Sequence, residues 1–112
     1  MIHIKRLQED GADVMALVGE IDASSSIDLD LAIAKSVGEG FTKLLIDCSA
    51  LEYISSAGLG VFMSYIEEFR EKGIQMVLFS MNEKVANTFQ ILGLNELLKI
   101  ATDKVEAKKM LA

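Results

Sequence analysis

The sequence predicts an α/β domain whose mixed, mainly parallel β-sheet is flanked by about four helices. Short apolar segments with strand character alternate along the chain with longer segments whose apolar residues recur at helical spacing. Strands that alternate with helices form parallel sheets through right-handed crossovers. The chain has 112 residues and no proline-rich or low-complexity linker, so residues 1–112 are expected to form one domain.

The N-terminal segment is expected to form a β-hairpin. Ile2 and Ile4 alternate with polar residues, residues 9–11 have turn composition, and residues 14–18 are apolar. Three further strands are expected at 42–46, 74–79 and 96–100, where short apolar stretches suit the middle of a sheet. The strand at 42–46 should end on Asp47 and open into a polar loop.

The first two helices carry clear apolar stripes. The first is expected to be capped within the serine cluster at 24–26 and to run to about residue 37. Helical spacing predicts that its core-facing residues are Ile27, Leu31, Ala34 and Val37. The second is expected to run without a break over 57–72 and to bury Leu59, Phe62, Ile66 and Phe69.

The last two helices are bounded by capping residues. One should begin at Ser80 or Asn82 and end at Gly93, and Thr102 should cap the other. The predicted core-facing residues of the helix that ends at Gly93 are Val85, Phe89 and Leu92.

Binding sites in parallel sheets lie beyond the carboxyl ends of the strands. The loop after strand 42–46 falls there, and so does the loop at 19–22 if strand 14–18 runs in the same direction. The two loops are then expected to share one surface. Ser55 and Ser56 lead into the 57–72 helix at this surface, and Gly58 and Gly60 keep the first turn of that helix bare.

A serine hydroxyl at the start of a helix has two interpretations. It is an N-cap that accepts a backbone N–H of the first turn. Alternatively, it is a site for a phosphate, whose negative charge a helix N-terminus stabilises. The residues themselves leave both interpretations open for Ser55 and for Ser56.

Composition limits the classes of function. No apolar stretch approaches the roughly 20 residues that cross a bilayer, and the net charge of −6 argues against nucleic acid and anionic lipid as partners. Cys48 is the only cysteine, and its side chain is expected to fill space as a buried or half-buried small residue. No signal-peptide pattern is present, so a cytoplasmic location is expected. His3 is the only histidine and is expected to face solvent, so no metal, cofactor or Ser-His-Asp site is predicted.

Two adjoining stretches resemble the signature of STAS domains, most closely that of the bacterial anti-sigma factor antagonists. They are LIDCSAL at 45–51 and YISSAGLG at 53–60. The GEID sequence at 19–22 matches a second, weaker family element, and residues 82–94 are similar to a later family helix. The resemblance covers essentially the whole chain and implies a small STAS-type domain with a mixed sheet flanked by helices.

The resemblance also implies partner switching. An unphosphorylated antagonist binds an anti-sigma factor that is also a serine kinase, and this frees the sigma factor. The kinase uses ATP to phosphorylate one serine and thereby releases the antagonist, which a separate phosphatase resets. When the sequences are aligned on the GLG at 58–60, the acceptor serine is Ser56. Ser55 stands where many members have aspartate, and Asp22 corresponds to an acidic residue near the acceptor.

The sequence therefore predicts a substrate of a serine kinase that is not itself an enzyme. Its predicted partner-binding residues are Asp22, Ser55, Gly58, Leu59, Gly60 and Val61. The alternative is a STAS scaffold or regulatory module that binds its partners without being phosphorylated. The oligomeric state is left open.

Overall fold

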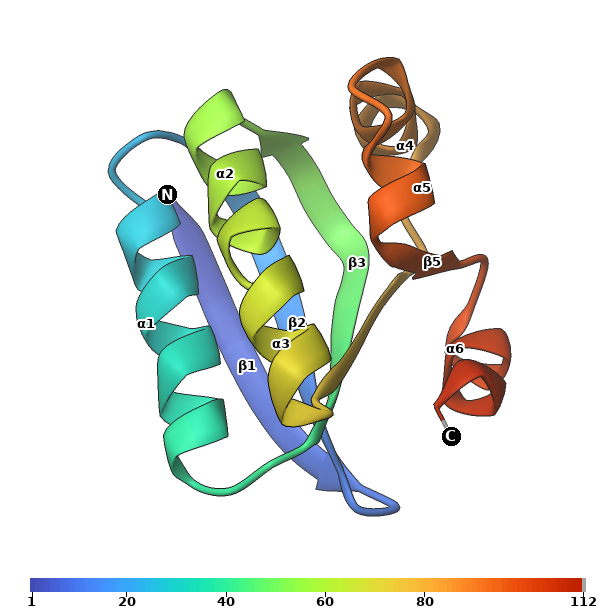
Figure 1. The fold of residues 1–112 in the computed structure, drawn as a ribbon. Helices are drawn as coiled ribbons and strands as arrows, with labels where there is room; N and C mark the ends of the chain where they lie inside the picture. The colour runs from blue at the N-terminus through green and yellow to red at the C-terminus, as the bar shows by residue number, and fades with distance from the viewer. Residues whose placement is uncertain (112) are drawn as a thin grey trace.

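A single five-stranded sheet runs through the computed structural model, which describes residues 1–111 (Figure 1). Its strands lie in sequence order and are β1 (Ile2–Glu9), β2 (Ala12–Ile21), β3 (Lys43–Ile54), β4 (Gln75–Phe79) and β5 (Lys99–Ala101). β1 pairs with β2 antiparallel, and every other neighbouring pair is parallel. The predicted α/β fold with a mixed, mainly parallel sheet is thus confirmed.

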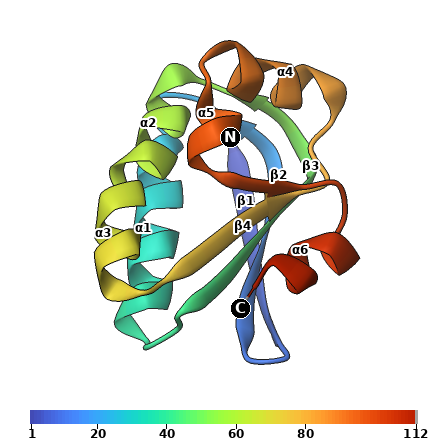
Figure 2. The ribbon, with the colours of Figure 1, turned by 45° about the vertical axis from the view of Figure 1, so that its right-hand side comes forward.

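Helices cover both faces of this sheet. They are α1 (Ser26–Gly38), α2 (Ser56–Ser64), α3 (Ile66–Lys72), α4 (Glu83–Ile91), α5 (Leu94–Leu97) and α6 (Lys104–Met110). Figure 2 shows α1, α2 and α3 together on one side of the strands and α6 on the other.

The core has two parts, one on each face of the sheet. The larger part lies under α1, α2 and α3 and includes Met15, Leu17, Ile33, Phe62 and Phe89. The smaller part lies under α6 and includes Val14, Leu45, Val77 and Ala107. Cys48 is buried in the larger part, as predicted. Its burial raises the pKa of the thiol to about 12, so the side chain stays protonated.

The predicted core face of α1 is wrong for Ile27, Leu31 and Ala34 and right for Val37, which is partly buried against the larger core. Ile27 and Leu31 are 61% and 64% exposed, whereas Leu29 and Ile33 are fully buried against the sheet. α1 has apolar residues on two sides, so helical spacing fits both stripes and does not identify the one that the sheet covers. The serine cap is also wrong in detail: Ser25 occupies the N-cap position, but its side chain bonds no α1 amide.

The helix predicted over 57–72 is divided at Tyr65 into α2 and α3. Tyr65 is 9% exposed, and its hydroxyl donates a hydrogen bond to the Asp30 carboxylate of α1. Its ring also lies 5.0 Å from that of Phe69. The hydrogen bond to Asp30 anchors the break to α1, and the ring contact joins it to α3.

β3 is longer than predicted. The segment after Asp47 was expected to be a loop, but it continues as strand to Ile54 and pairs with β2. Pairing with β4 stops at Asp47, so the last part of β3 has one strand neighbour. Polar side chains such as Glu52 are exposed there, because the strand is no longer in the middle of the sheet.

Three smaller predictions near the C-terminus are corrected. Residues 96–97 belong to α5, which leaves β5 only three residues long. Leu92 is 57% exposed and does not join the core. Asp103 caps α6, because its carboxylate accepts a hydrogen bond from Glu106 N–H. The Glu106 carboxylate in turn accepts from Thr102 N–H, in a variant of the capping box, so Thr102 is not the cap itself. Asn82, one of the two predicted residues, caps α4.

A candidate partner-binding site at the start of α2

Ser55 connects the end of β3 to α2, and its hydroxyl oxygen, carbonyl oxygen and backbone N–H each form a hydrogen bond. Its hydroxyl oxygen accepts a hydrogen bond from Gly58 N–H at 3.2 Å, which makes Ser55 the N-cap. Its carbonyl oxygen accepts from Leu59 N–H at 3.0 Å. Its own N–H donates to the carbonyl oxygen of Ile21 at 2.8 Å. Ser55 therefore holds α2 to the ends of β2 and β3.

Ser56 has a different environment. It is the first residue of α2 and is exposed. Within the part of the chain that the structure describes, its hydroxyl has no hydrogen-bond partner. The structure thus assigns capping to Ser55 and leaves the Ser56 hydroxyl free at the positive end of the helix.

Gly58 brings the first turn of α2 onto the sheet. A Cβ atom at this position would lie 2.7 Å from a methyl group of Ile21 and 2.8 Å from a side-chain carbon of Ile54. Only glycine lets the helix approach the two strand ends this closely. The interpretation of Gly58 as a bare surface position is therefore wrong, because its α-carbon faces the interior.

The other predicted residues of this turn divide between interior and surface. Leu59 is 3% exposed and packs in the larger core, so its side chain does not reach a partner. Val61 is half-buried against the same core. Gly60 is exposed, and a Cβ atom added to it would meet nothing within 4 Å, so another protein can approach the helix backbone there.

Asp22 begins the loop that joins β2 to α1, and hydrogen bonds order this loop. Its carboxylate accepts from Ser25 N–H at 2.8 Å and from the Ser24 hydroxyl at 2.9 Å. Its own N–H donates to the Ser25 hydroxyl at 2.8 Å. The backbone N–H of Ser25 and the two serine hydroxyls hold the pKa of Asp22 well below its usual range. Asp22 is therefore a fixed negative charge at neutral pH.

The structure brings the ends of β2 and β3 to one edge of the sheet, as predicted, although residues 19–21 and 48–54 are strand and not loop. β2 and β3 are parallel, so the segments that follow them leave the same edge of the sheet, and Ile21 pairs with Ile54 at that edge. A hydrogen bond joins Ile21 to Ser55. Asp22 follows Ile21 directly in the chain, and Ser56 follows Ser55. The site therefore presents a free hydroxyl, a bare helical turn and an ordered carboxylate.

His3, the only histidine of the sequence, lies away from Ser56. His3 is exposed, as predicted, and it alternates with Ile2 and Ile4, which pack against the larger core. It therefore lies on the face of the sheet opposite α2, where it cannot act as a base for Ser56. The described residues contain no cluster of three or more His, Cys, Asp or Glu side chains that could hold a metal ion.

The site is also a surface and not a cavity. A pocket of about 270 Å³ lies between α3 and the α5–β5 segment, and neither Ser56 nor Asp22 lines it. None of the described helices is long and apolar enough to span a membrane.

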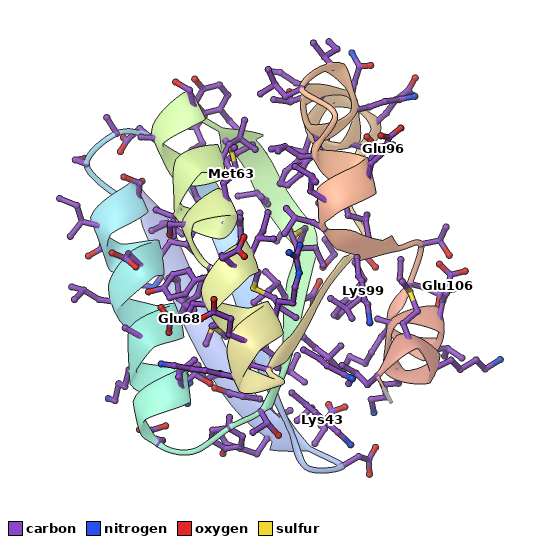
Figure 3. All side chains as sticks on the ribbon, viewed as in Figure 1. Lys43, Met63, Glu68, Glu96, Lys99 and Glu106 are labelled. Carbon is purple, nitrogen blue, oxygen red and sulfur yellow. The ribbon has the colours of Figure 1, made fainter. Side chains whose placement is uncertain are left out.

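One feature of the site was not visible in the sequence. Spacing did not distinguish Ser55 from Ser56, because either fits the N-cap; the hydrogen bond from Gly58 separates them. Met63 of α2 is 47% exposed. It was not singled out in the sequence, although it does not belong to the apolar stripe that faces the core. It lies on the side of α2 that faces α4 and α5 (Figure 3).

Comparison with known proteins identifies the family. The STAS domain model matches residues 3–107. The anti-sigma-B factor antagonist of Listeria monocytogenes is 33% identical over 100 residues, which cover 88% of this chain and 86% of that protein.

Solved structures show the same fold. An anti-sigma factor antagonist from Mycobacterium paratuberculosis matches with a TM-score of 0.87 at 23% identity, over 99% of this chain and 94% of that one. The Bacillus cell fate determinant SpoIIAA, solved in its phosphorylated form, matches with a TM-score of 0.70 at 18% identity, over 97% and 98%. Because the STAS domain model matches residues 3–107 and the Listeria relative is 33% identical over most of both chains, this chain belongs to the STAS domain family.

Proposed function

We propose that this protein is an anti-sigma factor antagonist whose binding is switched off by phosphorylation of Ser56. Its partner is an anti-sigma factor that also acts as the serine kinase, and a phosphatase restores the binding form. The protein is the substrate of that kinase and performs no catalysis itself. The relatives named as anti-sigma factor antagonists support the general role.

One observation supports Ser56 as the acceptor. The two adjacent serines differ in that the Ser55 hydroxyl caps α2, whereas the Ser56 hydroxyl is exposed and unbonded within the described residues. A kinase reaches an exposed, unbonded hydroxyl without breaking a helix cap. Phosphorylation of Ser55 would modify the oxygen that accepts from Gly58 N–H, whereas phosphorylation of Ser56 leaves that hydrogen bond untouched.

The position of Ser56 also explains how the switch works without unfolding the protein. A phosphoserine carries about −1.5 to −2 charges at neutral pH, and a negative charge at a helix N-terminus is stabilising. α2 should therefore remain folded. A partner that fits the bare hydroxyl instead meets a dianion beside the ionised Asp22, and an uncompensated charge in an interface costs on the order of 2–5 kcal/mol.

The test is the intact mass of the protein after incubation with ATP and each purified anti-sigma factor kinase of its source genome. Wild type and Ser55→Ala should each gain one phosphate with the cognate kinase, and Ser56→Ala should gain none. Ser55→Ala is the matched control, since it removes the neighbouring hydroxyl.

A phosphate that remains in Ser56→Ala would contradict the assignment of the acceptor. An unchanged mass with a kinase that demonstrably binds the wild-type protein would contradict the switch. That second result would favour a STAS scaffold that binds without being phosphorylated.

A further inference from the structure

Two large apolar side chains on α1 face solvent. Ile27 and Leu31 are 61% and 64% exposed, and they lie one helical turn apart on the same side of the helix. The opposite side of α1 is already buried through Leu29 and Ile33. The core therefore does not account for the exposed pair.

We propose that the anti-sigma factor docks across the outer face of α1 as well as the first turn of α2, with Ile27 and Leu31 as apolar anchors. This inference rests on the proposed function and adds to it a second contact region, on a different helix. The partner surface that fits is an apolar centre surrounded by lysine and arginine side chains.

The area that a stable interface needs supports this extension. A specific protein interface buries about 800 Å² on each partner. The exposed residues of the first turn of α2 are Ser56, Ala57 and Gly60, which are all small. They leave most of the binding energy to neighbouring surface, and a few large side chains that become fully desolvated in an interface usually supply most of that energy.

The α1 surface is continuous with the candidate site. α1 starts directly from the Asp22 loop, where Ser26 N–H donates to the Asp22 carbonyl oxygen at 3.0 Å. α1 and α2 lie side by side on the same face of the sheet (Figures 1 and 2). One partner can therefore cover the first turns of both helices.

The charged residues around Ile27 and Leu31 indicate the charge of the partner surface. Asp22 and Asp28 are exposed at the start of α1, and neither forms an ion pair with a lysine or arginine side chain among the described residues. Glu68 of α3 lies on the side that faces α1 and adds to the negative charge, although Lys72 pairs with it at 3.2 Å (Figure 3). Lys35 of α1 is an exposed basic residue one turn after Leu31, so the border of the apolar pair is mainly but not wholly acidic and complements a mainly basic partner surface.

The experiment measures the affinity of the purified anti-sigma factor kinase by isothermal titration calorimetry without ATP. The proteins compared are wild type, the double variant Ile27→Ala/Leu31→Ala, Val105→Ala and Ile91→Ala. Alanine keeps the helix propensity high, so these truncations should leave the melting temperature unchanged. Val105 is the matched control, because it is 65% exposed on α6, across the sheet from α1.

The double variant is expected to bind about tenfold more weakly or worse, and Val105→Ala should stay within about twofold of wild type. Equal affinity of the double variant and wild type, with Ser56→Asp abolishing binding, would overturn docking across α1 and leave the proposed function standing. A loss confined to Ile91→Ala would also overturn it, by placing the added surface on α4. Wild type that binds none of the kinases would overturn both proposals.

Discussion

The backbone N–H of Ser55 donates a hydrogen bond of 2.8 Å to the backbone carbonyl oxygen of Ile21. This bond joins the last residue of β2 to the residue that caps α2. It fixes the Asp22 loop against the start of α2, so the ionised carboxylate and the free hydroxyl of Ser56 belong to one surface.

The two serines should differ in their effect on stability. Ser55→Ala removes the side-chain bond to Gly58 N–H and should lower the free energy of unfolding by about 1 kcal/mol. Ser56→Ala removes no bond within the described residues and should change it by less than about 0.5 kcal/mol. Urea denaturation of both variants measures these values. Equal losses would show that Ser56 also supports the fold.

Aspartate at position 55 should preserve the cap. Aspartate is as good an N-cap as serine, and its charge favours the helix N-terminus. Ser55→Asp should therefore unfold at the wild-type urea concentration or slightly above it. A loss as large as that of Ser55→Ala would mean that the cap requires the hydroxyl.

Gly58 and Gly60 offer a second matched pair. Gly58→Ala places a Cβ within 2.8 Å of Ile21 and Ile54, and overpacking of this kind costs about 1–3 kcal/mol. Gly60→Ala meets nothing within 4 Å and should stabilise the protein by about 0.5–1 kcal/mol through helix propensity. Denaturation curves that showed the same sign for both variants would contradict the close approach of α2 to the sheet.

The fold was largely predictable because its main signals are local. Alternating strand and helix segments indicated the parallel sheet, and the apolar stripe of Leu59, Phe62 and Phe69 identified the helical face that the sheet buries. The stripe on α1 failed because Ile27 and Leu31 fit helical spacing as well as Leu29 and Ile33 do. The choice between them depends on how the chain leaves the Asp22 loop, which is tertiary information.

The candidate site was predictable as a place and less so in its details. The order of strands predicted that β2 and β3 end at the same edge of the sheet, and the parallel pairing of Ile21 with Ile54 confirms this. The inward orientation of Gly58 was missed, because glycine suits a bare surface and a tight internal contact equally well. The break at Tyr65 was missed as well, since its bond to Asp30 joins residues that are 35 positions apart.

A buried ion pair should dominate the stability of the hairpin. Asp13 is fully buried, and its Oδ2 accepts from Arg6 Nε at 2.9 Å and from Arg6 Nη2 at 2.5 Å. Asp13→Asn removes the buried carboxylate and leaves Arg6 with the exposed Glu39, at 2.6 Å, as its acidic partner, so it should cost about 3 kcal/mol. The control Glu67→Gln breaks an exposed pair with Arg70 at 3.7 Å and should cost less than about 0.5 kcal/mol. Similar losses in both variants, measured by urea denaturation, would contradict this account.

The same carboxylate predicts how stability depends on pH. Burial by itself raises the pKa of Asp13, but the hydrogen bonds from Arg6, Ser36 and Gln8 together with the charge of Arg6 outweigh it and lower the pKa in the folded state. A lowered folded-state pKa contributes stability above the unfolded-state value of about 3.9, and this stability is lost as the pH falls through the folded-state value. The free energy of unfolding should therefore decrease below about pH 4, and it should decrease less steeply in Asp13→Asn. Parallel pH profiles would contradict the assignment.

The central claim is that a phosphate on Ser56 prevents partner binding while the fold stays intact. The most direct test is the affinity of the anti-sigma factor for the unmodified protein and for the protein phosphorylated on Ser56, with the melting temperature of each form. We expect the phosphorylated form to bind about a hundredfold more weakly, or worse, and to melt at or above the temperature of the unmodified form. Equal affinities of the two forms would contradict the switch, and a large drop in the melting temperature would contradict its mechanism.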